Sequence, residues 1–350
     1  MPEHAPEEPT ARPPRRAAAL GVAIALGCAV GFLLVEVFLR AFLPLHFVGG
    51  YVDAYEYDED LGARLVPGRH HLETSDFLEE VYTNRLGTVN FQDSFQGYGR
   101  LVFALGDSFT QGTGVASDAS YPFQLDLQLN LRGGRYEKRF AVVNLGLAAF
   151  GMKQSLVALR RYREEIGTPD AVLFLGCSND WSDDRLFDSG HRHRHLVAGS
   201  PHFGPALGLL QWIGFRSEVG KRAKLLLGEL RRERTPGYGD VNYGQTEGVK
   251  TNVAELQEPL FEELRARAEE MGARLVVGWT DAPGDSSGGY AWLRAWAERR
   301  GVAFADWHAR ALSVREAIPA LGLENPHSGG HYRTWVNQMV AAAFAEQIER

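Results

Sequence analysis

Cysteine is scarce in this chain, and positive charge is not in excess. Only two cysteines occur among 350 residues, Cys28 in an apolar run and Cys177 beside an expected strand end, so we expect no disulfide. The formal net charge of -7 argues against a general nucleic-acid binder, because such proteins carry a basic surface. The 39 glycines and 16 prolines follow no repeat period, which excludes collagen-like and solenoid folds.

A long hydrophobic run, by contrast, lies near the N-terminus. Residues 17–39 contain Glu36 as their only charge, and a helix of this length extends about 35 Å, enough to cross a bilayer. Three arginines precede the run and Arg40 follows it, so the charge bias places residues 1–16 in the cytoplasm and the bulk of the chain outside. The alternatives are a cleavable signal peptide or lipidation at Cys28, although no clear small-x-small cleavage site follows the run.

The rest of the chain divides into a bridge and a regular domain. Residues 40–97 mix aromatic, acidic, Gly and Pro residues without a sustained period, and we expect an irregular arm or short strands packed on the domain. From residue 98 to residue 350, apolar strands alternate with helices. Strands are expected at residues 100–106, 140–146, 170–176, 273–279 and 302–307, and helices at 121–132, 153–167, 253–272, 290–301 and 332–349.

This alternation predicts a three-layer α/β/α sandwich with a five-stranded parallel sheet covered on both faces. Residues 181–250 interrupt the alternation. We interpret them as an insertion near the carboxyl ends of the strands, where ligands bind in such sheets.

Polar residues follow the first three expected strands. Ser108 follows the first, Asn144 and Gly146 follow the second, and Asn179 and Asp180 follow the third. Because these strand ends meet at one edge of the sheet, a hydroxyl and an amide donor converge there. A serine nucleophile needs a base, and a tetrahedral intermediate needs preorganised N–H donors. A histidine just before the last helix would complete the set.

The blocks GDSFTQGTGV, NLGLAAFG and SND, followed by a late histidine, resemble in this order the SGNH (GDSL-type) hydrolase superfamily over about residues 99–350. The layout of an apolar helix, DEDLGARLVPG and then the GDS block also resembles a bacterial membrane-anchored subgroup. The resemblance implies the flavodoxin-like SGNH fold, with Ser108 as nucleophile. It implies an oxyanion hole formed by the N–H of Ser108, the N–H of Ala149 where the family has glycine, and the side chain of Asn179. Asp107 is interpreted as ordering the turn.

The family's Asp-x-x-His pattern has two partial matches near the C-terminus. His331 aligns well with the run into the last helix, but Ser328 then stands where Asp belongs. His327 as the base would have Glu324 in the place of the Asp. We favour His331, since a Ser–His dyad works if a backbone carbonyl orients the imidazole.

By this resemblance the chain is expected to hydrolyse esters or transfer acyl groups without a metal or organic cofactor. Its expected substrates are O-acylated envelope or secreted glycans, or other esters. The expected location is the bacterial cytoplasmic membrane, with a single-pass anchor and an extracytoplasmic domain. The alternative is a catalytically silent glycan-binding or scaffolding module, which the missing Asp favours. The alternating His191, His193 and His195 are interpreted as a solvated loop, because no Cys or carboxylate set accompanies them.

Overall fold

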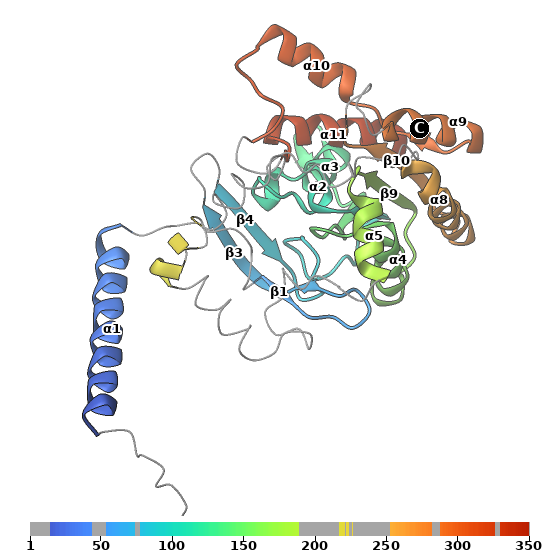
Figure 1. Ribbon diagram of the computed structural model, residues 1–350. Coiled ribbons are helices and arrows are strands. Elements are labelled where there is room, and N and C mark those ends of the chain that lie inside the picture. The colour runs from blue at the N-terminus through green and yellow to red at the C-terminus, as the bar shows by residue number, and fades with distance from the viewer. Residues whose placement is uncertain are drawn as a thin grey trace, which may run out of the picture.

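The computed structural model describes residues 15–43, 54–73, 78–188, 217–220, 222–223, 226, 253–281, 288–325 and 330–349. Within these ranges the chain forms an N-terminal helix, an arm of short strands and an α/β domain (Figure 1). The histidines at 191, 193 and 195, and also His327 and Ser328, lie outside the described residues.

The first helix, α1, spans Arg15–Phe42. Its segment Ala19–Phe42 has a mean hydropathy of 2.5 and is long and apolar enough to cross a membrane. Its large apolar side chains are exposed, including Leu34 and Phe42. The expected membrane run at 17–39 therefore lies within one continuous helix, seen in blue in Figure 1.

The central sheet has five parallel strands in the order β11-β10-β9-β5-β8. Read from β8 in chain order, this is 2-1-3-4-5, the flavodoxin-like arrangement, so the predicted fold class is confirmed. The strands are β5 (Arg100–Gly106), β8 (Phe140–Asn144), β9 (Ala171–Gly176), β10 (Arg274–Trp279) and β11 (Ala303–Phe304). The nucleophile strand, β5, lies between β8 and β9.

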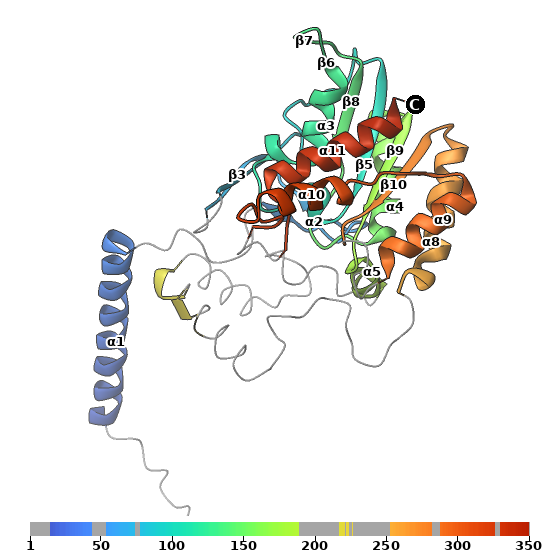
Figure 2. The ribbon, with the colours of Figure 1, turned by 90° about the horizontal axis from the view of Figure 1, so that it is seen from above.

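Helices cover both faces of this sheet, as Figure 2 shows. Alternate residues of β5 separate the two cores: Phe103 and Leu105 belong to one, Val102 and Ala104 to the other. One core is closed by α4 (Met152–Ile166), α8 (Val253–Glu270) and α9 (Gly289–Arg300). The other is closed by α3 (Tyr121–Asn130), α10 (His308–Ala317) and α11 (Thr334–Ile348). Burial on both faces explains why the strands are continuously apolar.

Several local expectations differ from the structure, and β11 (Ala303–Phe304) is shorter than the strand expected at residues 302–307. The helix expected at 121–132 ends at Asn130, and β6 (Leu131–Arg132) pairs with β7 (Arg135–Tyr136) as a hairpin. Gly133 and Gly134 both have positive φ, 55° and 78°, which suits a two-residue hairpin turn and stops the helix. In addition, α5 (Asp180–Asp188) occupies the start of the expected insertion.

The arm between α1 and the sheet forms two small antiparallel pairs. These are β1 (Tyr55–Glu56) with β2 (Arg64–Leu65), and β3 (Gly68–Glu73) with β4 (Leu78–Thr83). Buried arm residues join the core next to α4, among them Tyr55, Leu61 and Val81. Asn90 also bonds the edge strand β8, donating to the Val142 carbonyl at 2.8 Å. The arm thus covers an edge of the sheet that would otherwise expose unpaired backbone groups.

Candidate active site

The turn after β5 positions Ser108. Gly106 has φ 145°, and a Cβ there would lie 2.4 Å from Thr110 Oγ1 and 2.7 Å from the Leu175 carbonyl oxygen, so the turn requires glycine. Asp107 Oδ1 accepts the N–H of Phe109 at 2.9 Å and caps the short helix α2 (Ser108–Gln111). This confirms Asp107 as a turn-ordering residue. As the first helical residue, Ser108 has an N–H with no intrahelical acceptor.

His331 meets Ser108 across the edge of the sheet. Its Nε2 lies 2.7 Å from Ser108 Oγ, which is a hydrogen-bonding distance. The ring of Phe109 packs beside the imidazole, with centroids 4.9 Å apart. The helix that carries the nucleophile, α2, therefore also helps to fix the position of the His331 ring.

The backbone around His331 is held by several bonds. Its carbonyl accepts the N–H of Asn325 at 2.9 Å, and Asn325 Nδ2 donates to the Gly114 carbonyl at 2.7 Å, in the loop after α2. Glu324 and Tyr332 form an isolated antiparallel bridge, and the Tyr332 hydroxyl donates to the carbonyl of Thr280 after β10. The histidine is thus tied to loops that follow two strands of the sheet.

The loop after β8 places Ala149 in the position expected of an oxyanion donor. The Phe150 N–H donates to the Leu147 carbonyl at 3.0 Å, closing a four-residue turn. Ala149 is the third residue of this turn and has φ 62°, the one positive φ at a non-glycine residue in the described chain. Glycine is favoured at such a position. Within the described ranges, neither Ser108 N–H nor Ala149 N–H donates to another group.

Asn179 lies beyond the end of β9, just before α5, and is held by a carboxylate. Its Nδ2 donates to Asp183 Oδ2 at 2.8 Å, one turn along α5. An amide nitrogen carries two hydrogens, and the Asn179 side chain also makes a hydrogen bond to the Asp107 carboxyl, which opposes the rise in the pKa of that group. Ser182 Oγ donates to the Asn179 carbonyl at 2.7 Å and holds the backbone.

Four buried aspartates surround this end of the site: Asp107, Asp180, Asp183 and Asp184. Burial, followed by repulsion from neighbouring carboxylates, raises the pKa of Asp183 to about 7. Burial raises the pKa of Asp184 to about 6. It also raises the pKa values of Asp107 and Asp180. Burial therefore makes these carboxyls easier to protonate than they are in water. One of them, Asp107, directly precedes the nucleophile, and such perturbed groups concentrate at functional sites.

The remaining predicted groups are Glu324, His327 and Cys177. The carbonyl of Glu324 accepts Arg333 Nε at 2.9 Å, and burial raises the pKa of the Glu324 carboxyl. Its expected partner in the alternative triad, His327, lies outside the described residues, so that alternative stays a prediction. Cys177 is buried, and burial raises the pKa of its thiol, which fits a core residue. No group of metal ligands occurs within the described ranges.

Sequence reasoning missed two supports of the site. Asp183 holds Asn179 from one helical turn away, and the spacing of four residues along SNDWSDD was the available signal. Tyr55 lies 56 residues before Gln111, and its hydroxyl donates to Gln111 Oε1 at 2.9 Å. No local pattern links two residues so far apart.

No family model and no curated protein matches the chain. A member of the lipolytic protein G-D-S-L family from Veillonella parvula DSM 2008 is 11% identical, with a TM-score of 0.37 and coverage of 71% of this chain and 98% of that one. TesA is 14% identical, with a TM-score of 0.41 and the same coverage, 71% and 98%. In fold, this chain resembles solved structures of GDSL-type proteins. A GDSL-like lipase from Bacteroides thetaiotaomicron VPI-5482 is 11% identical, with a TM-score of 0.33 and coverage of 72% and 88%.

Proposed function

We propose that this chain is an SGNH-type serine esterase or acyl transferase that works through an acyl-serine intermediate. The observation that carries the proposal is the distance of 2.7 Å between His331 Nε2 and Ser108 Oγ. A general base must reach the proton it removes at about 2.6–3.2 Å between heavy atoms. The N–H groups of Ser108 and Ala149 and the amide of Asn179 supply the donors that such chemistry needs.

In the acylation step, Ser108 Oγ attacks the ester carbonyl carbon while His331 Nε2 takes the hydroxyl proton. The carbonyl oxygen becomes an oxyanion held by the N–H of Ser108, the N–H of Ala149 and Nδ2 of Asn179. The intermediate then breaks its bond to the leaving alcohol, which receives the proton from His331. The acyl group remains on Ser108.

In the deacylation step, His331 removes a proton from a second hydroxyl group, which attacks the acyl-serine. If that group is water, the product is a carboxylic acid; if it is a sugar hydroxyl, the product is a new ester. Both outcomes restore Ser108 by the same proton transfers. We propose O-acylated envelope or secreted glycans as the substrate class, with α1 as a membrane anchor and the α/β domain outside the cytoplasm.

A second candidate is a catalytically silent module that binds glycans or organises an envelope complex. The observation that favours it is the serine at position 328, where the family pattern has Asp. The two candidates differ in whether Ser108 is activated, because only an activated serine reacts with a fluorophosphonate.

The test uses the full chain in detergent. We expect fluorophosphonate labelling of the unchanged protein and of Ser313→Ala, a control on the exposed side of α10, but not of Ser108→Ala. His331→Ala should approach the loss of Ser108→Ala in the hydrolysis of short-chain aryl esters, and the double variant should lose little more, because the two act as one unit. Adding a glycan acceptor then separates transfer from hydrolysis. An unlabelled, correctly folded protein supports the silent module instead.

A further inference from the structure

The turn that presents the Ala149 N–H is supported by a side chain from the nucleophile helix. Gln111, the last residue of α2, has its Oε1 2.7 Å from the N–H of Ala148, which donates to it. That bond fixes which end of the Gln111 amide faces the turn, since only the oxygen can accept. Gln111 is 1% exposed, so water cannot replace this acceptor.

Gln111 is itself held by the arm that precedes the sheet. The hydroxyl of Tyr55 donates to the same Oε1 at 2.9 Å, and Tyr55 is 3% exposed. Burial raises the pKa of Tyr55, which favours the neutral phenol that donates this hydrogen bond. The oxygen of Gln111 therefore accepts from Tyr55 on the arm and from Ala148 in the turn.

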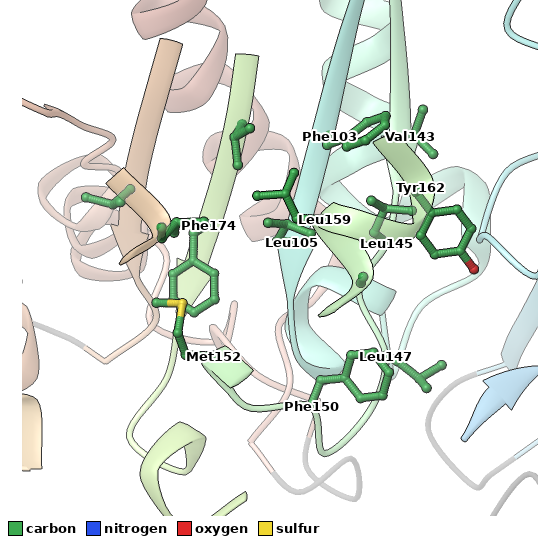
Figure 3. Packing of buried hydrophobic residues seen from close by; sticks show 14 of the residues in the cluster. Phe103, Leu105, Val143, Leu145, Leu147, Phe150, Met152, Leu159, Tyr162 and Phe174 are labelled. Atoms are coloured by element: carbon green, nitrogen blue, oxygen red, sulfur yellow. The ribbon is translucent and has the colours of Figure 1, made fainter. Parts of the chain in front are cut away.

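The other contacts of the turn anchor its two ends, whereas Gln111 bonds its centre. Leu147 and Phe150, on either side of the Ala148–Ala149 pair, are buried in the core (Figure 3). Ala148 and Ala149 are only partly buried, and a positive φ costs an alanine about 1–2 kcal/mol. A strained residue keeps its conformation only where its surroundings impose it, and the bond from Ala148 N–H to Gln111 acts on the adjacent peptide.

We propose that Tyr55, from the arm between α1 and the sheet, is a positioning residue that acts through Gln111 to hold Ala148 and thereby aim the Ala149 N–H at the oxyanion. This inference rests on the proposed function. It adds that the arm between α1 and the sheet helps to position a hydrogen-bond donor of the catalytic site.

Two variants test the proposal in the full chain in detergent, with aryl-ester hydrolysis as the assay. Tyr55→Phe removes only the hydroxyl, and Gln111→Leu removes the shared acceptor. We expect Gln111→Leu to lower kcat about tenfold to a hundredfold and Tyr55→Phe several-fold, less than the roughly 10²–10³-fold loss that follows removal of an oxyanion donor. KM should change little, because the donor acts on the transition state. Tyr55→Phe should have no further effect in the Gln111→Leu background.

Tyr162→Phe is the matched control. The Tyr162 hydroxyl also joins the arm to the domain, donating to the Leu86 carbonyl at 3.0 Å from a side chain that is 5% exposed. We expect it to lower the unfolding temperature about as much as Tyr55→Phe while leaving kcat unchanged. If both tyrosine variants lose stability alike and keep full kcat, the positioning role is wrong.

The outcomes separate this inference from the proposed function. Loss of activity in Ser108→Ala with unchanged kcat in both Tyr55→Phe and Gln111→Leu contradicts the positioning role alone. Equal activity of Ser108→Ala and the unchanged protein contradicts the proposed function itself. If Gln111→Leu does not fold, the rate of fluorophosphonate labelling of folded Tyr55→Phe, compared with Tyr162→Phe, decides the question.

Discussion

We predict that the stability of the protein depends on pH through Glu79, a carboxyl buried where the arm meets the loop after the nucleophile helix. It lies on β4, its side chain is 0% exposed, and the neighbouring Tyr82 N–H donates to Ser117 Oγ at 2.8 Å across the same contact. Burial raises the pKa of Glu79 to about 8, with the Gly114 N–H opposing the rise in part. The folded protein therefore binds a proton here that the unfolded chain releases at lower pH.

The sign and size of the effect follow from proton linkage. Between pH 4.5, the ordinary value, and pH 8, the folded state holds more protons than the unfolded state, so the free energy of unfolding falls as the pH rises. The contribution of the protonated Glu79 to the free energy of unfolding is fully present below about pH 4.5, and it is lost completely above about pH 8. At about 1.36 kcal/mol per pKa unit, the loss amounts to at most about 5 kcal/mol, a large fraction of the 5–15 kcal/mol typical of a domain.

Glu79→Gln removes the titration and keeps the shape. We expect urea unfolding of the full chain in detergent, followed by tryptophan fluorescence, to show similar stability for the two proteins at pH 5 and a more stable Glu79→Gln at pH 9. Glu80→Gln, next in the strand and paired with Arg69 at the surface, is the control and should keep the slope of the unchanged protein. Equal pH slopes for Glu79→Gln and the unchanged protein would refute the reasoning.

Two further predictions concern the oxyanion side chain and the membrane topology. Asn179→Ala should lower kcat by about a hundredfold or more, since one such donor contributes about 3 kcal/mol to the barrier, while the protein still folds; a rate within twofold of normal would remove Asn179 from the mechanism. A reporter enzyme that is active only outside the cytoplasm should work when fused after Arg350, and activity only from a cytoplasmic-type reporter would reverse the proposed orientation.

The central sheet could be predicted from the sequence because each of its strands is marked by residues that are contiguous in the chain. An apolar run such as residues 100–106 can be satisfied only by burial on both faces, and the structure places all five expected strands in one parallel sheet. The Gly106-Asp107-Ser108 turn was readable for a similar reason. Its glycine, its capping aspartate and its serine hydroxyl are adjacent in sequence and belong to the same turn.

Short strands packed on the domain were one expectation for the arm, but which residues pair there could not be predicted, because the pairing depends on distant partners. Its strands are two to six residues long, and short strands gain little from propensity alone. Tyr55 becomes ordered against Gln111 and Leu61 against Gln154, whose Nε2 donates to the Leu61 carbonyl at 2.8 Å. For Asp183 the four-residue spacing from Asn179 was an available signal, but the sequence does not reveal that this acidic side chain is only 7% exposed.

The arm also limits where the proposed enzyme can act. The apolar helix ends at Phe42 and Tyr55 already contacts the nucleophile helix. The thirteen residues from one to the other extend at most about 45 Å. If α1 spans the membrane as proposed, the position of Tyr55 keeps Ser108 within roughly that distance of the bilayer surface. An esterase tethered in this way acts on acyl groups that come close to the membrane, and a substrate fixed farther away must move toward it. Under the proposed function, this limit favours substrates that are mobile or lie close to the membrane over those held in a distant layer.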